Sequence, residues 1–127
     1  MDQFDVVDFV FDPVKTALAN FKGFKEKSED GVKGNHFVVN ALPWNENDDY
    51  INSGYVNVNI FIPLTENGMV KRQPMKEAVR AAKTGLKTIT VSEEGLYRDV
   101  QIIWVETVDL KEGFDCKNIK LLIKTDK

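Results

Sequence analysis

The segment Tyr55–Ile62 (YVNVNIFI) most constrains what this chain can fold into, because aliphatic side chains occupy every second position. A β-strand places successive side chains on opposite faces of its sheet. One face of this strand therefore carries Val56, Val58, Ile60 and Ile62. The other face carries Tyr55, Asn57, Asn59 and Phe61, and Pro63 ends the strand. We therefore expect a β-sheet in the fold.

Two other segments show helical spacing. From Pro74 to about Leu86, apolar residues recur at i, i+4, i+7 and i+11, as Met75, Val79, Ala82 and Leu86. Asp12-Pro13 predicts a helix start, with a helix to about Phe21. The segment before it is open to two interpretations, an amphipathic helix or an extended arm rich in β-branched residues. The helix is favoured because aspartates recur at helical spacing, at Asp2, Asp5, Asp8 and Asp12.

Further strands are expected over His36–Leu42, Ile89–Val91, Val100–Val108 and about Lys117–Thr125. In the third of these, Val100, Ile102 and Trp104 would share one face. Residues 23–35 read as a loop or loose hairpin, with an extra strand possible near Phe24. Neighbouring strands joined by short loops favour antiparallel pairing. We expect a single α+β domain over residues 1–127, a mostly antiparallel sheet of four to five strands packed by two helices.

Composition excludes several classes of protein. With 127 residues, 43 % of them hydrophobic, the chain can bury one core, which argues against intrinsic disorder. A net charge of −3 excludes a surface built wholly for nucleic acid. Met1–Asp12 lacks Lys and Arg, and no apolar run approaches membrane-spanning length, so we expect neither a targeting segment nor a membrane span. One cysteine permits no intrachain disulfide and fits synthesis in a reducing, intracellular compartment.

Motifs for catalysis are missing. The single His36 has no Ser or Cys motif beside it, and Cys116 is distant in sequence. Phosphate-loop, dinucleotide and zincin motifs are absent, and the acidic stretch Glu46, Asp48 and Asp49 is typical of a solvated loop rather than a calcium site. We expect no enzyme activity, cofactor or metal. The alternative is a small soluble ligand-binding domain or enzyme, which would need a pocket built from His36, Trp44 and Asp49.

Two charged helix faces and one polar strand face are candidate interfaces. Residues 71–87 hold six basic residues and one acid, and four of the basic residues form a stripe, Lys76, Arg80, Lys83 and Lys87. This basic stripe is either an ordinary solvated face or a contact for phosphates or an acidic partner. In a ring of identical subunits it would meet the acidic face of a neighbour, Asp2, Asp5, Asp8 and Asp12. The asparagines at Asn40, Asn57 and Asn59 predict a solvent-exposed face or, alternatively, a subunit contact.

Three segments resemble a family of small phage and prophage proteins from Bacteroidetes. Phe37–Leu42 (FVVNAL) and Ser53–Pro63 (SGYVNVNIFIP) are similar to the family's IVIN-L strand and its GxVNVNIYVP strand. Phe114–Lys124 (FDCKNIKLLIK) resembles its terminal HFxNIRIxF strand, with Asp115-Cys116 in place of the usual residues. The family is similar to phage tail-terminator, or tail-completion, proteins.

The resemblance implies an α+β fold and a structural function in the virion tail, with assembly in the bacterial host cytoplasm. It implies a homo-oligomeric ring, commonly a hexamer, that caps the tail tube and joins it to the head connector. Under this interpretation the expected interface residues are Lys76, Arg80, Lys83, Lys87, Asn57, Asn59, Asp5 and Asp8. The partners would be the tail-tube protein, the connector and, through some of the basic residues, phage DNA in the channel.

Overall fold

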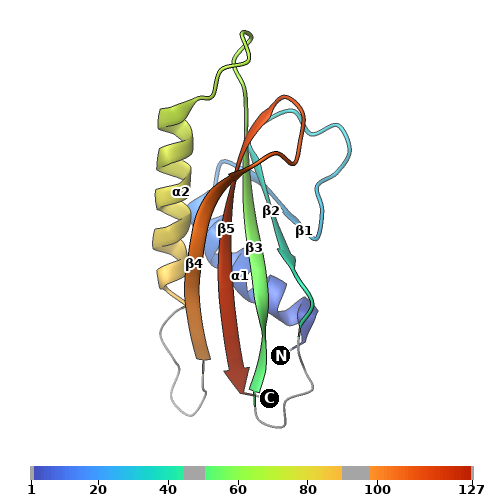
Figure 1. The fold of residues 1–127 in the computed structure, drawn as a ribbon, viewed down its shortest axis with the longest axis vertical. Helices are drawn as coiled ribbons and strands as arrows, with labels where there is room; N and C mark the ends of the chain where they lie inside the picture. The colour runs from blue at the N-terminus through green and yellow to red at the C-terminus, as the bar shows by residue number, and fades with distance from the viewer. Residues whose placement is uncertain (1, 45–50, 90–97, 127) are drawn as a thin grey trace.

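A computed structural model describes residues 2–44, 51–89 and 98–126. Its elements are α1 (Gln3–Ala17), β1 (Lys22–Lys25), β2 (His36–Ala41), β3 (Ile51–Pro63), α2 (Arg72–Lys87), β4 (Arg98–Val108) and β5 (Phe114–Asp126). The five strands form one sheet in the order β1-β2-β3-β5-β4. Both helices cover the same face of that sheet, which leaves the other face open (Figure 1). The expected α+β class, with two helices and five strands, is confirmed.

The sheet is mixed, which corrects the expectation of a mostly antiparallel one. β3 pairs antiparallel with β2 and β5, and β5 pairs antiparallel with β4, but β1 runs parallel to β2. Parallel neighbours cannot be joined by a tight hairpin turn. The connection over residues 26–35, read from sequence as a loop or hairpin, instead returns the chain to the same end of the sheet before β2 starts. The extra strand near Phe24 is confirmed as β1.

The alternation in β3 is confirmed, and it determines which face carries the core. Val56, Val58 and Ile60 are fully buried against the helices, together with Ile119, Leu121 and Ile123 of β5. From α2 the core receives Met75, Ala78, Ala82 and Leu86. Val79, expected in that stripe, is only partly buried. It therefore remains available to line a surface groove.

Helix α1 begins ten residues before the start that Asp12-Pro13 predicts, and Pro13 lies inside it. The helix has an earlier and better cap, because Asp2 and Asp5 each accept a hydrogen bond from the other's backbone N–H, at 2.8 and 3.1 Å. The buried stripe Val6, Val7, Val10 and Val14 then holds both halves of the helix on the sheet. The helix ends at Ala17 rather than Phe21, because Leu18 leaves helical geometry.

A β-bulge in β4 overturns the expected facing of Trp104. The register with β5 shifts between Ile102 and Trp104, so that Val100 and Ile102 lie over core residues of β5 while Trp104 pairs with Lys120 on the open face. Val105 takes the helix-facing position in its place, opposite Ile119. The strand expected at Ile89–Val91 is not formed at Ile89, which follows α2, and its remainder lies outside the described residues.

Candidate functional site

The basic stripe of α2 lines a groove between that helix and β4. Three of its four predicted members, Lys76, Arg80 and Lys83, border a cavity of about 490 Å³ together with Arg72 and Lys117. Lys87 is exposed at the end of the helix and does not line it. The groove is also lined by four apolar side chains, Val70, Met75, Val79 and Val105, and by Asp115. We call this cavity the α2–β4 groove.

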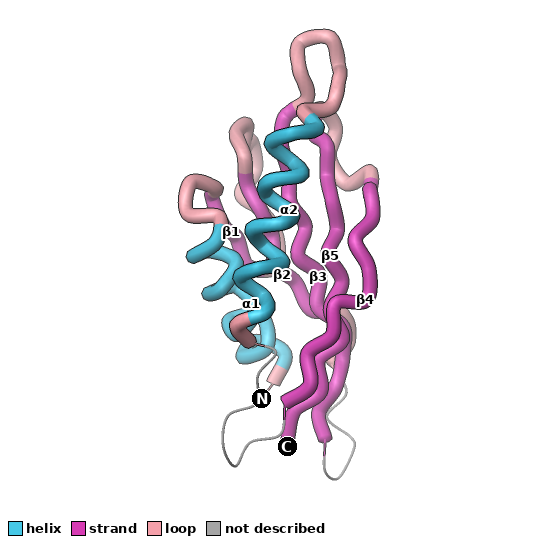
Figure 2. Tube along the Cα trace, turned by 90° about the vertical axis from the view of Figure 1, so that its left-hand side faces the viewer, coloured by secondary structure: helices cyan, strands magenta, loops and turns pink. Residues whose placement is uncertain are grey.

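The acidic face of α1 lies away from that groove. Asp5, Asp8 and Asp12 are all exposed, and Asp5 is occupied in the helix cap. Asp8 forms an ion pair with Lys25 of β1 at 2.7 Å, which raises the pKa of Lys25 through the hydrogen bond to Asp8. Phe4 precedes Asp8 by one helical turn, and its side chain is 71 % exposed. In Figure 2, α2 lies between α1 and β4, so that helix separates α1 from the α2–β4 groove.

The predicted asparagine face is a hydrogen-bonded ladder across the open face of the sheet. Asn118 of β5 donates from Nδ2 to Oδ1 of Asn59 at 2.8 Å and of Asn57 at 3.1 Å. Asn57 donates to Oδ1 of Asn40 at 3.1 Å, and Trp104 donates from Nε1 to Oδ1 of Asn118 at 3.3 Å. Asn59 and Asn118 are only 5 % and 6 % exposed. The favoured expectation of a solvated face is therefore wrong at Asn59.

An aromatic cluster fills the open face beyond the ladder, and His36 is at its centre. The imidazole stacks on Phe61 with ring centroids 4.6 Å apart and meets the edge of Phe114 at 5.2 Å. Its Nδ1 lies 2.8 Å from the carbonyl oxygen of Gly34. Burial lowers the pKa of His36 below its usual 6.5, against the opposing effect of the Gly34 hydrogen bond, and Lys111 lowers it further. His36 is therefore a neutral core side chain.

Among the described residues, His36 and Cys116 are not brought together. In the register, Phe61 lies between His36 of β2 and Cys116 of β5, which separates the two by about 10 Å. Burial raises the pKa of the Cys116 thiol to about 12, with Asp115 adding to the effect. Trp44 packs against the main core rather than this cluster, and Asp49 lies outside the described residues.

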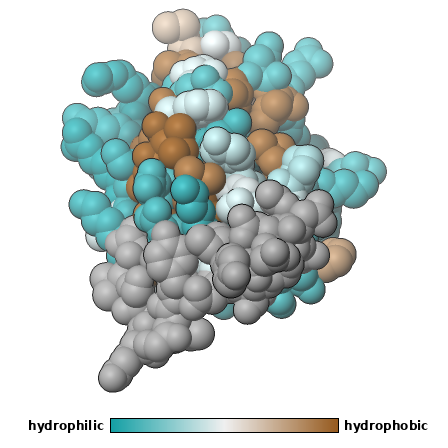
Figure 3. Space-filling view, turned by 60° about the horizontal axis from the view of Figure 1, so that its bottom comes forward, coloured by the Kyte–Doolittle hydropathy of each residue, from teal (hydrophilic) through white to brown (hydrophobic). Residues whose placement is uncertain are grey.

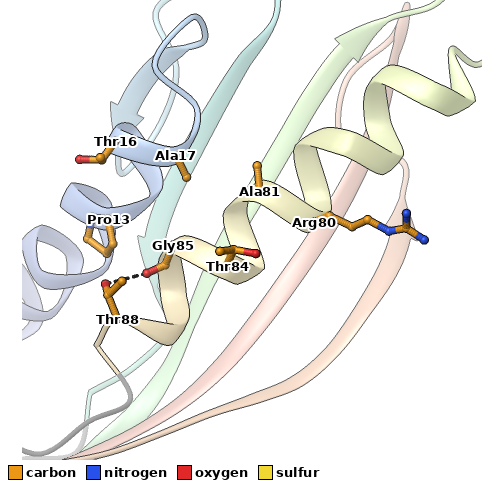
Figure 4. A pocket seen from close by; sticks show the side chains of 8 residues that line it. All are labelled: Pro13, Thr16, Ala17, Arg80, Ala81, Thr84, Gly85 and Thr88. Carbon is orange, nitrogen blue, oxygen red and sulfur yellow. Dashed lines mark hydrogen bonds between the residues drawn. The ribbon is translucent and has the colours of Figure 1, made fainter.

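A cavity of about 590 Å³ lies between the two helices (Figure 4). Small and uncharged side chains line it except for Arg80, which points away from α1. The hydroxyl of Thr88 at its rim donates to the carbonyl of Gly85 at 2.7 Å. Here the two helix backbones approach closely, since a Cβ on Gly85 would lie 2.8 Å from the carbonyl oxygen of Pro13. This cavity holds no group suited to acid–base chemistry.

The β4 edge of the sheet is long and partly apolar. β4 has eleven residues, and within the described part of the chain β5 is its one neighbouring strand. Three successive apolar side chains are exposed there: Ile103 at 38 %, Trp104 at 43 % and Val105 at 37 %. Natural proteins usually shorten, charge or cover such an edge. The β4 edge is therefore a candidate contact surface.

Three residues of these surfaces were not among the sequence candidates: Phe4, Trp104 and Asn118. Phe4 could have been found from its four-residue spacing to Asp8 and Asp12, which puts all three on one helix face. Asn118 repeats the pattern of polar residues alternating with core residues that marked Asn57 and Asn59. Trp104 required the bulge, which leaves no signal in the sequence.

Two further kinds of feature are metal-ligand clusters and membrane-spanning helices. Among residues 2–44, 51–89 and 98–126, no three His, Cys, Asp or Glu side chains gather as metal ligands would, and no helix is long and apolar enough to cross a membrane. The acidic stretch at Glu46, Asp48 and Asp49 lies outside those ranges. Seen from the end in Figure 3, the visible described surface shows separate apolar patches divided by polar side chains.

Comparison of the chain with protein-family models gives no match, and no curated protein matches it.

Proposed function

We propose that this chain is a non-enzymatic phage structural protein, which forms a homo-oligomeric ring that caps the tail tube and joins it to the head connector. The observation that carries the proposal is the β4 edge beside the basic α2–β4 groove, together with the exposed aspartates of the separate helix α1. Ile103 and Val105 are exposed on that edge, next to Lys76, Arg80 and Lys83. An edge strand presents backbone N–H and C=O groups that can pair with another chain. The resemblance of the β3 segment to tail-terminator proteins supports the same function.

The mechanism is geometric. A basic surface and an acidic surface at different places on one subunit favour a contact between unlike surfaces of two copies. Such contacts close into a ring when the rotation from one copy to the next permits it. A ring matched to the end of the tube stops further tube growth and presents a new surface to the connector. Basic side chains left uncovered by subunit contacts would face DNA passing through the channel. The site of action is the virion tail, after assembly in the bacterial host cytoplasm.

The ligand-binding or enzymatic alternative is less well supported. Two of its three candidate residues, His36 and Trp44, belong to different clusters in the described part of the chain, since His36 is buried by aromatic rings and Trp44 packs against the main core. The cavity between the helices and the α2–β4 groove are lined by aliphatic, threonine and basic side chains, with Asp115 as the single acid.

Tube growth tests the proposal directly. The tail-tube protein of the same phage genome is polymerised with and without the full-length chain, and tube lengths and ends are imaged by electron microscopy. We expect shorter tubes with a ring at one end. The charge-reversed variant Arg80→Glu/Lys83→Glu should leave tubes long and uncapped. Unchanged tube lengths and bare ends with the wild-type chain would contradict the proposal.

A further inference from the structure

We propose that two copies of this chain associate through unlike surfaces, with the exposed face of α1 in one copy docked in the α2–β4 groove of the next. The inference rests on the proposed function, because it names the contact from which a ring would be built. It also identifies the occupant of the groove as a second copy of this chain.

The groove has the chemistry of a receptor for an acidic, apolar helix. Its lining combines apolar side chains, Met75, Val79 and Val105, with the basic side chains of Arg72, Lys76, Arg80, Lys83 and Lys117. The single acid in the lining is Asp115, which is 6 % exposed and lies 3.6 Å from Nζ of Lys117. Among the described residues, Lys76, Arg80 and Lys83 have no acidic partner within ion-pair distance. Positive charge is therefore available for a ligand from outside the subunit.

The exposed face of α1 has the matching chemistry. Phe4 is 71 % exposed, although burying a phenylalanine fully contributes about 2–3 kcal/mol. Asp8 and Asp12 follow it at intervals of four residues, so the three side chains lie in one row. Among the described residues, the ion-pair partner of Asp8 is the exposed Lys25, whose charge also interacts with Asp12. The row presents one aromatic anchor followed by two carboxylates.

The two rows also match in length. A helix rises about 1.5 Å per residue, so the row from Phe4 to Asp12 is about 12 Å long. The basic row from Lys76 to Lys83 is about 10 Å long on the same scale. If the Phe4 side chain packs against the apolar residues of the groove, both carboxylates of its row therefore come within reach of the basic residues of the groove. The cavity between α1 and α2 is a poorer receptor, since Arg80 is its only charged lining residue.

The contact cannot form within one subunit, because α2 separates α1 from the groove (Figure 2). Each copy therefore offers one row and one groove, and successive copies repeat the same contact, which closes into a ring where the rotation allows. A helix lying in the groove would also cover Val105 and the adjoining β4 edge. Docking thus accounts for the exposure of Phe4 and for the uncovered edge together.

Mixing two defective variants of the full-length chain tests the contact. Phe4→Asp removes the anchor and keeps the groove, whereas Arg80→Glu/Lys83→Glu alters the groove and keeps the anchor. In sedimentation velocity we expect the wild-type chain to form a closed oligomer and each variant alone to be monomeric. The equimolar mixture should form a dimer and nothing larger, because only one intact row and one intact groove remain between the two variants.

Matched controls separate docking from folding and from net charge. Met69→Asp introduces an acid at an apolar residue that is 64 % exposed but lines neither surface, and it should assemble like the wild type. Lys27→Glu/Lys33→Glu makes the same charge change in the β1–β2 connection and should also assemble. Circular dichroism and the urea midpoint should show every variant folded, since Phe4, Arg80 and Met69 are exposed.

Each outcome has a distinct meaning. Assembly of the wild type together with assembly of either defective variant would overturn the docking contact and leave the proposed ring function standing. Monomeric variants that form no mixed dimer would also overturn it, because both residue sets would then act elsewhere. A wild-type chain that stays monomeric at millimolar concentration would contradict both the contact and ring formation by the free protein.

Discussion

Replacing Asn118 by alanine should destabilise the fold far more than its position in a single strand suggests. The change removes both donations from Nδ2, to Asn57 and Asn59, and the acceptor for Trp104. Asn59 is 5 % exposed, so losing its donor leaves a buried acceptor unsatisfied, at about 1–3 kcal/mol. Asn57 is half-buried and adds up to about 1 kcal/mol, while water replaces much of the bond to the exposed Trp104.

The expected loss is therefore about 2–4 kcal/mol, a large share of the roughly 5–15 kcal/mol typical of a folded domain. Urea unfolding followed by far-UV circular dichroism measures it by linear extrapolation. Asn118→Leu, which keeps the branched shape of the side chain and removes the hydrogen bonds, should also destabilise the fold. Gln101→Ala is the matched control on the same strand pair, because the exposed amide bonds only Asp99, and it should change stability by less than about 0.5 kcal/mol. A loss for Asn118→Ala no larger than that of Gln101→Ala would refute the account of the ladder.

Three further predictions concern single residues. Gly85→Ala should lower the thermal unfolding midpoint, although alanine is favoured over glycine in helices by about 1 kcal/mol, because the new Cβ would lie 2.8 Å from the carbonyl oxygen of Pro13. The control Gly34→Ala, where the Cβ meets open space, should leave the midpoint nearly unchanged. The lowered pKa of His36 means that the unfolded state binds more protons than the folded state, so the free energy of unfolding should fall as pH drops below 6.5. His36→Phe should flatten that part of the plot of unfolding free energy against pH. An unchanged plot would reject the buried neutral imidazole. Cys116, with its pKa raised to about 12, should resist alkylation at pH 8 in the native protein and react after unfolding, as followed by mass spectrometry; rapid native labelling would contradict its burial.

Much of the fold was predictable because its strongest signals are periodic. The alternation of Val56, Val58 and Ile60 located the core face of β3, and the stripe that includes Met75 and Leu86 located α2. Where two local signals competed, the aspartate spacing favoured the right one, a helix over the segment before Asp12. Asp12-Pro13 is a good helix start in isolation, but the Asp2–Asp5 capping box and the valines beyond it begin α1 earlier.

Features that depend on pairing between distant strands were not predictable. The parallel direction of β1 depends on where the 26–35 connection returns, and the bulge at Ile103 depends on register with β5. The asparagine ladder needs Asn118 to lie opposite Asn59, a pairing across 59 positions of sequence. The basic stripe was visible in the sequence. The apolar lining of the α2–β4 groove was not, because Val105 takes its helix-facing position only through that bulge.

The central claim is that this chain assembles into a ring, and native mass spectrometry combined with negative-stain class averages of the purified wild-type chain tests it most directly. The account predicts one dominant species whose mass is an integral multiple of 14.4 kDa, six subunits by resemblance to tail terminators, and whose images show a closed annulus with a central channel. A monomer at every concentration, or an open filament of indefinite length, would contradict it.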